Sequence, residues 1–150
     1  MNLNLDLTDE RWNVRKEDAP RQRFLREQKK VNYDGVRYAV GFKNSEYGVS
    51  IIKNYGSYGY EDDQWEIALL KNDKLYHRLH EDFDMLDDVI GHLTDDEVRE
   101  WIEKFYDIYV LGNDLEIKIH RIQKQIYQIG LEIEQLKEDL NEIDFKVKRP

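Results

Sequence analysis

The chain has 150 residues, 37% of them charged, and a formal net charge of −9 at pH 7. This length fits one domain, or one small domain followed by a helical appendage. No apolar run approaches the ~20 residues that a membrane span requires, and residues 1–10 are acidic without a hydrophobic signal region. The chain contains no cysteine, which excludes disulfides and thiolate metal sites. We therefore expect a cytoplasmic protein.

The charge is distributed unevenly along the chain. Residues 11–30 carry eight Arg and Lys against three acids, whereas residues 61–100 carry fourteen acids against four Lys and Arg. An acidic surface repels the phosphates of nucleic acid and attracts basic proteins, so we expect a protein partner and no direct binding of nucleic acid. A solvated surface that only maintains solubility is the alternative interpretation.

Residues 1–34 are predicted to form a basic N-terminal arm. Residues 1–14 show only a short alternation of Asn and Leu, which predicts an edge strand or a disordered arm. Pro20 can open a helix that continues to Lys30 with little apolar content and a basic face. This face either binds phosphate or acidic groups, or offsets the acidic half of the same chain.

Four segments with the pattern of strands follow. Apolar side chains alternate with polar or small ones in residues 36–43, and good β-formers dominate residues 47–54. Residues 64–71 repeat the alternation, and residues 75–78 return after a tight turn. Because sequential strands with short connections pair with their neighbours, we expect a four-stranded antiparallel meander.

Helices are predicted after these strands. Residues 84–92 favour a short helical turn. Thr94 and Glu97 have the spacing of a capping box, in which each side chain accepts a hydrogen bond from the backbone amide of the other. The helix that starts here should run to about Tyr109 and cover one face of the sheet with its apolar side. Residues 112–113, Gly and Asn, then break it.

The last third of the chain carries a heptad pattern. Ten apolar residues follow one another at alternating steps of four and three residues, which is the spacing of a coiled-coil seam. A stripe of this kind needs a partner to cover it. Val147 ends the seam, and its predicted oligomerisation residues are Leu115, Ile119, Ile122, Ile126, Ile129, Ile133, Leu136, Leu140 and Ile143.

A homodimer of long helices is the first interpretation of this seam. Three of its d positions, Ile122, Ile129 and Ile143, push the preference towards higher order. Antiparallel or hairpin-like packing is the second interpretation, and a helix docked on the sheet of its own chain is the third. Gly130 lies in the middle of the helix and weakens it by about 1 kcal/mol.

No catalytic motif stands out among the chemistry-bearing residues. His77 and His80, with nearby Glu81, Asp82 and Asp84, could ligate zinc. Their order does not match His-Glu-x-x-His, and at a strand end the two imidazoles should point apart. We therefore predict no catalytic residues, no metal site and no cofactor.

Tyrosines and acids gather in the loop that links the second and third predicted strands. Residues 55–60 alternate Tyr with Gly and Ser, and residues 61–63 are acidic. Base stacking needs basic residues to hold phosphates, so a protein interface with tyrosine anchors fits better. Tyrosines that pack back on the sheet are the alternative. The predicted target-binding residues are Tyr55, Tyr58, Tyr60, Glu61, Asp62, Asp63, Asp84, Asp87 and Asp88.

A resemblance covers residues 36–108. Its segments are residues 47–52, 55–59, 65–69, 87–91 and 93–98. They resemble small uncharacterised proteins that phages and prophages of Gram-positive bacteria encode. In size and acidity the chain is also similar, at the level of class, to anti-CRISPR and other anti-defence inhibitors. The resemblance implies a phage protein and implies no catalytic residues.

These features together predict an α+β protein in three parts. Residues 1–34 form the basic arm or helix, residues 35–111 the globular domain, and residues 112–150 the oligomerisation helix. The first functional hypothesis is a non-enzymatic, anti-CRISPR-like inhibitor of a host defence protein, in which the acidic surface is a nucleic-acid mimic that competes for a basic groove. The alternatives are a self-assembling structural or scaffolding phage protein, and a metal-dependent enzyme that uses His77 and His80.

Overall fold

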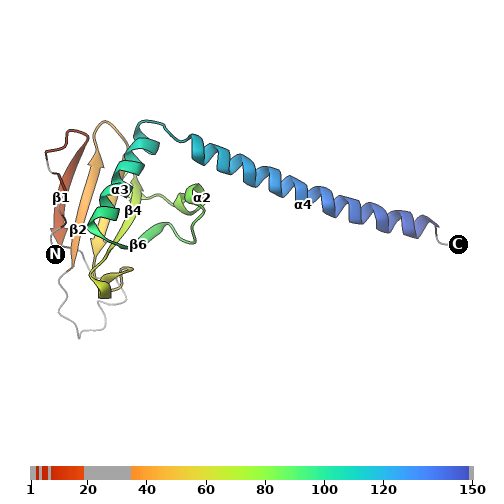
Figure 1. Cartoon of the computed structure of the whole chain (residues 1–150), viewed down its shortest axis with the longest axis horizontal. Coiled ribbons are helices and arrows are strands. Elements are labelled where there is room, and N and C mark those ends of the chain that lie inside the picture. The colour runs from red at the N-terminus through yellow and green to blue at the C-terminus, as the bar shows by residue number, and fades with distance from the viewer. Residues whose placement is uncertain (1–2, 4, 7, 19–34, 149–150) are drawn as a thin grey trace. The chain divides into compact units, whose positions relative to one another are not determined.

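The computed structural model describes residues 3, 5–6, 8–18 and 35–148 of the chain (Figure 1). The backbone divides into two compact units, Met1–Asp114 and Leu115–Pro150. The first unit, called the head below, contains the described strands and the shorter helices. The second unit contains one long helix, α4 (Leu115–Lys148).

The head is built on one antiparallel sheet. Its strands are β1 (Trp12–Asp18), β2 (Val36–Phe42), β3 (Tyr47–Lys53), β4 (Trp65–Lys71), β5 (Lys74–Leu75) and β6 (Val89–Leu93). The first five lie side by side in chain order, and β6 also pairs with β4. Since β5 pairs with the end of β4 and β6 pairs with its beginning, these two short strands share one edge.

This architecture confirms the predicted α+β class, with its antiparallel meander, covering helix and long C-terminal helix. The four predicted strands correspond to β2, β3, β4 and β5, although β5 is Lys74–Leu75 and overlaps the predicted residues 75–78 only at Leu75. Strands β1 and β6 come in addition. The predicted helix that opens at Pro20 lies outside the described residues.

Alternation along the central strands sends one set of side chains into the core. Register pairs such as Ile51 with Ile67 place these side chains next to one another across strands. The core residues of this face are buried: Val36, Tyr38, Val40 and Phe42 from β2, Val49 and Ile51 from β3, and Trp65, Ile67 and Leu69 from β4.

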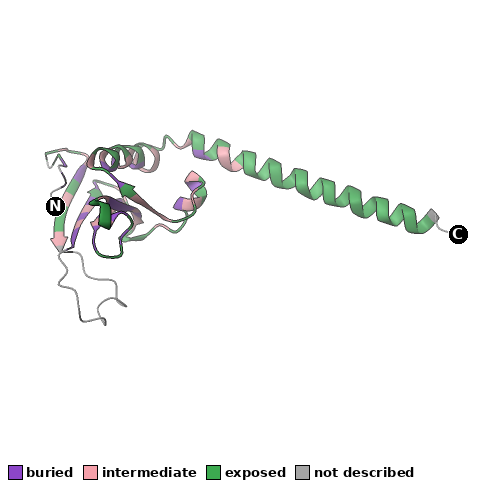
Figure 2. Ribbon diagram, turned by 60° about the horizontal axis from the view of Figure 1, so that its bottom comes forward, coloured by how far each residue is buried: buried purple, intermediate pink, exposed green. Residues whose placement is uncertain are grey.

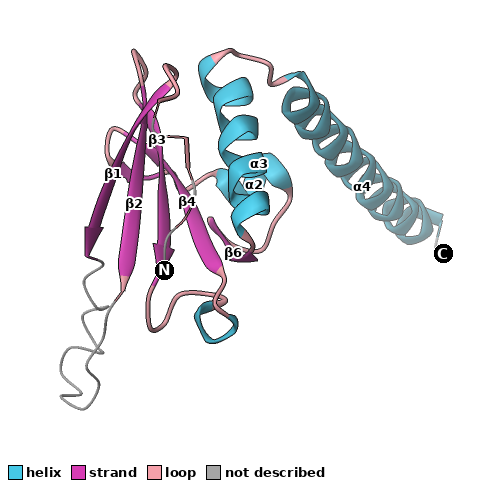
Figure 3. Ribbon diagram, turned by 60° about the vertical axis from the view of Figure 1, so that its left-hand side comes forward, coloured by secondary structure: helices cyan, strands magenta, loops and turns pink. Residues whose placement is uncertain are grey.

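Helix α3 (Asp95–Phe105) covers this face of the sheet (Figure 3). The predicted capping box is present, since the Thr94 hydroxyl accepts from the Glu97 amide and the Glu97 carboxylate accepts from the Thr94 amide. Its start is also tied to the sheet, because Trp65 Nε1 donates to Asp95 Oδ1 at 2.7 Å. The apolar side of α3 buries Val98, Ile102 and Phe105. A π-helical turn, η2 (Tyr106–Val110), then extends it.

The predicted helical turn over residues 84–92 is wrong. Helix α2 (Leu79–Phe83) comes earlier, and β6 occupies the second half of the region. The outer edge of β4 offers unpaired backbone groups, and β6 pairs there with Ile67 and Ala68. Long-range pairing therefore overrides the local pattern, and the β-branched residues Val89 and Ile90 suit a strand.

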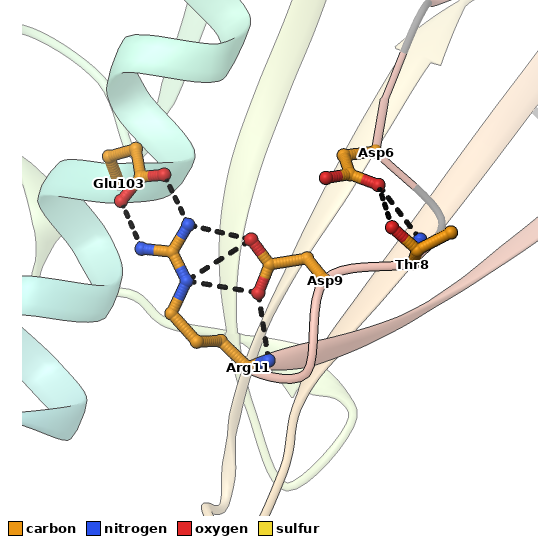
Figure 4. Close-up of polar contacts among 5 residues, drawn as sticks. All are labelled: Asp6, Thr8, Asp9, Arg11 and Glu103. Carbon is orange, nitrogen blue, oxygen red and sulfur yellow. Dashed lines mark hydrogen bonds and ion pairs between the residues drawn. The ribbon is translucent and has the colours of Figure 1, made fainter.

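Strand β1 is fastened to α3 by an arginine that lies between two acids (Figure 4). The Arg11 guanidinium contacts the carboxylates of Asp9 and Glu103, and lies 4.2 Å from the centre of the Trp12 ring. Hydrogen bonds from Arg11 lower the pKa of Asp9. Trp12 in turn packs edge-on against Phe42 of β2. These contacts join the first strand to residues almost a hundred positions later in the chain.

Helix α4 differs from the head because most of it is exposed, apart from a short stretch near its start where Ile117 is buried (Figure 2). The helix has 34 residues, which at ~1.5 Å per residue makes it about 50 Å long. All ten seam residues are exposed, with exposed fractions between 45% and 77%. Within the described part of the chain, no helix combines the length and apolar composition needed to cross a membrane.

Candidate functional site

The candidate site is the connection between β3 and β4, residues 55–63, called the tyrosine–acid loop below. A tight turn opens it, in which the Ser57 hydroxyl donates to the Asn54 carbonyl and accepts from the Asn54 amide. Gly59 follows with a φ of 95°. A Cβ at Gly59 would lie 2.9 Å from atoms of Gln64 and His92, so both the backbone angle and the space require glycine.

Two hydrogen bonds at Tyr58 hold this loop against the sheet. The Tyr58 amide donates to Glu66 Oε2 at 2.7 Å, and the Tyr58 carbonyl accepts from the His92 amide at 3.1 Å. The Tyr58 side chain also lies so close to Gly91 that a Cβ there would meet the Tyr58 Cβ at 2.1 Å. The loop is therefore fixed between β4 and β6.

Glu66 is the buried member of this arrangement. Burial raises the pKa of the Glu66 carboxyl and the charge of Asp87 raises it further, whereas the hydrogen bond from Tyr58 opposes the increase. The carboxyl thus carries a cost of desolvation that the hydrogen bond from the Tyr58 amide offsets in part. We infer from this contact that Glu66 positions the loop.

The loop presents aromatic and acidic groups around one hollow. Tyr55 and Tyr58 are exposed by 43% and 52%, and the ring of Tyr60 meets that of Tyr55 edge-on at 6.2 Å. The hollow measures about 410 Å³ and is lined by residues 55–62 together with His92. The carboxylates of Glu61 and Asp62 are exposed, and no other residue that the structure describes bonds to them.

Asp63 is the exception among the predicted acids of the loop. Its carboxylate pairs with the Lys53 ammonium at 3.0 Å. Lys53 is buried, with its ammonium 4.2 Å from the centre of the Trp65 ring. Because Asp63 balances a buried charge, it supports the fold as well as contributing to the acidic surface.

The second predicted acidic group, Asp84, Asp87 and Asp88, lies in the connection from α2 to β6. Asp84 ends α2 in a left-handed conformation, with a φ of 54°. Asp87 is exposed and accepts from the Asp88 amide at 2.7 Å. Asp88 is turned towards the amide and ring of His80, at 3.0 and 2.6 Å. Of the three, Asp88 is therefore the least available to a partner.

The two histidines approach the same carboxylate, so the expectation that they point apart is wrong. His77 Nδ1 lies 3.7 Å from Asp88 and His80 Nδ1 lies 2.6 Å from it. The hydrogen bond to Asp88 raises the pKa of His80. Burial raises the pKa of Asp88, but hydrogen bonds from His80 outweigh burial and leave it below its usual value. Among the described residues, no group of three or more His, Asp or Glu side chains is arranged to hold a metal ion.

Two features at this end of the head were not predicted as functional. His92 lines the hollow, and Leu86 is fully exposed although it was expected on a helical turn. Gly91 was an available signal for the first, since glycine within a strand marks a close approach of other chain segments. Nothing in the sequence around Leu86 indicates its exposure.

A larger hollow of about 770 Å³ lies on the sheet face opposite α3. Its lining includes the small residues Ala39, Gly41 and Gly48, and Gly41 pairs with Gly48 between β2 and β3. Of the two arginines that line it, Arg37 is engaged by Glu17 at 2.8 Å and by the Ser50 hydroxyl at 2.9 Å, and Arg15 lies 3.7 Å from Glu17. The tyrosine–acid loop offers more uncommitted charge, so it is the stronger candidate.

Comparisons with known proteins add no family. No family model, curated protein or solved structure matches this chain. Its function is therefore inferred from its own side chains.

Proposed function

We propose that this chain is a non-enzymatic phage protein that binds and inhibits a nucleic-acid-binding defence protein of the host cell, in the cytoplasm. The observation that carries the proposal is the tyrosine–acid loop. It exposes the carboxylates of Glu61 and Asp62, with no bond to any other described residue, beside two exposed tyrosines. These are groups that contact a basic protein surface well.

The chemistry of the loop favours a protein partner over a small substrate. Tyrosine supplies a large, rigid contact area at low cost in side-chain entropy. Carboxylates on a braced loop can take the place of phosphates in a basic groove, and mutual charge attraction speeds association. The phage origin in this proposal rests on the sequence resemblance of residues 36–108 to small phage proteins, which implies no particular activity.

The test uses an RNA-guided DNA nuclease of the Cas9 type, whose heteroduplex channel is positively charged. The full chain, added in molar excess before the target DNA, should block cleavage. The variant Glu61→Lys with Asp62→Lys should inhibit at least about tenfold more weakly, because both charges now repel the groove. Asp63 is left unchanged, since reversing it would place two ammonium groups together at Lys53.

The matched control is Glu10→Lys with Glu100→Lys, which alters the net charge by the same amount at exposed positions away from the loop. Equal loss of inhibition in both variants would mean that overall charge, not the loop, is recognised. Cleavage that proceeds at full rate with the unaltered chain would remove the inhibitor proposal.

A self-assembling structural protein is the second candidate function. It is favoured by a separate observation, the ten exposed seam residues of α4. Under this proposal α4 alone forms the assembly, the head is attached to it without a binding role, and the acids of its loop only maintain solubility. Glu61→Lys with Asp62→Lys would then leave every property of the protein unchanged except its net charge.

A further inference from the structure

We infer that α4 joins three copies of this chain, parallel and in register, in a three-stranded coiled coil. The helix runs without interruption through Leu115–Lys148, so the seam forms one continuous stripe on it. The ten residues of the seam are each at least 45% exposed. A stripe of this length is larger than the apolar patches that monomeric proteins leave in water. The inference concerns assembly and does not depend on the inhibitor proposal.

A further copy of the same chain is the occupant that fits this stripe. The alternating steps of four and three residues keep every seam residue on the line where identical helices meet. Gly130, the weakest helix former in α4, lies outside the seam, and a side chain there would meet open space. It therefore does not interrupt the contact.

The branching of the seam residues favours three strands over two. Two adjoining heptads carry Ile at both positions: Ile119 with Ile122, and Ile126 with Ile129. Isoleucine at both a and d shifts the preference from two strands to three or four, because a β-branched residue at d packs poorly in a two-stranded coil. Ile143 repeats this branching at the last d position. This favours three copies over the dimer that was the first expectation.

The flanking charges do not oppose a parallel orientation. Parallel helices in register place Glu132 opposite Lys137, which attract, and Asp139 opposite Asp144, which repel. The attraction and the repulsion approximately cancel.

An antiparallel arrangement that covers all ten seam residues brings only like charges together. Its facing pairs are Glu116 with Asp144, Lys118 with Lys146, and Glu132 with its own copy. An antiparallel arrangement slipped by one heptad pairs Glu116 with Lys137 and Lys118 with Asp139, but leaves Ile143 and Val147 of each chain in water. Exposed ion pairs contribute less free energy than the burial of those side chains, so the parallel arrangement is the more stable one.

Parallel assembly has a consequence for the heads. Each head is joined to its helix at Leu115, so three heads leave the coil at the same end.

The number of chains is tested by sedimentation of the full-length protein. We expect three times the mass of one chain. The variant Ile122→Leu, Ile129→Leu and Ile143→Leu places Leu at these d positions opposite Ile at most a positions, and should sediment at twice the mass. A mass of one, two or four chains for the unaltered protein would overturn the inference, as would a variant that stays at three.

The orientation is tested by a single cysteine, since the chain has none of its own. In parallel helices Leu136→Cys faces its own copies, so oxidation should link two chains of each trimer and leave one thiol in three free. In the fully covered antiparallel arrangement the same position faces Ile126 instead. A protein with Leu136→Cys that stays fully reduced would overturn the parallel orientation. Both experiments read assembly alone, so their outcome is distinct from that of the inhibition assay.

Discussion

The head and α4 contain similar apolar residues but place them in opposite environments. In the head, Val49, Ile51, Ile67 and Leu69 have exposed fractions of 0%. In α4, the least exposed seam residue, Ile119, is 45% exposed. The head closes its own core, because strand pairing and α3 supply both walls. A single helix buries little apolar surface by itself, so in the proposed assembly further chains cover the seam of α4.

The largest effect is expected from charges placed in the seam. Ile126→Glu with Ile133→Glu should separate the chains, since each lost burial costs about 1.5–3 kcal/mol in every copy. The lone helix should then lose much of its helical circular dichroism. Gln128→Glu with Asn141→Glu adds the same charges on the outer side of α4 and should leave the assembly intact.

A core truncation in the head should lower the stability of the head and leave the chains assembled. Ile67→Ala removes a fully buried side chain and should lower the free energy of unfolding of the head by about 2–5 kcal/mol. The mass in solution should stay unchanged at temperatures where the head is folded. Denaturant titration with sedimentation checks both points. Dissociation caused by Ile67→Ala would show that the head takes part in assembly.

A smaller effect is expected at the start of α3. Thr94→Ala removes the hydroxyl that accepts from the Glu97 amide, and should destabilise the head by about 1 kcal/mol. Thr94→Ser keeps the hydroxyl and should retain most of the stability. If thermal unfolding gives the two variants equal midpoints, the capping box contributes nothing.

The smallest effect is the pH dependence at His80. Its pKa is raised by Asp88, so its contribution to stability is fully present below its ordinary value of 6.5 and is lost as pH rises through the raised value. Asp88, whose pKa is lowered, loses its contribution only as pH falls through that lower value. His80→Ala should therefore reduce the midpoint of unfolding near pH 6 more than near pH 9. An equal reduction at both would contradict the ion pair.

Much of the head could be predicted from local pattern. The alternation in β2 and the spacing of Thr94 and Glu97 are contained in neighbouring residues, and both predictions were confirmed. Strand β6 could not be predicted in this way, because its pairing with β4 joins residues more than twenty positions apart. The attachment of β1 could not be predicted from local pattern either, since the Arg11 side chain bonds to the distant Glu103.

The same limit applies to the candidate site. Composition alone identified the tyrosines and acids of the loop, because they are adjacent in sequence. It could not show that Asp63 is paired with Lys53 or that Asp88 is paired with His80. These partners are set by which strands and loops become neighbours. The position of His92 beside the hollow is set in the same way, since its amide donates to the Tyr58 carbonyl.

The contrast between the two units is tested most directly by amide hydrogen exchange measured over a series of protein concentrations. Amides of β3 and β4 should exchange slowly and at rates independent of concentration, because their protection arises within one chain. Amides of α4 should be protected at high concentration and should lose protection on dilution, because theirs depends on other copies. If the amides of α4 stay protected at dilutions where the protein is a monomer, their protection arises within one chain, which contradicts the proposed assembly.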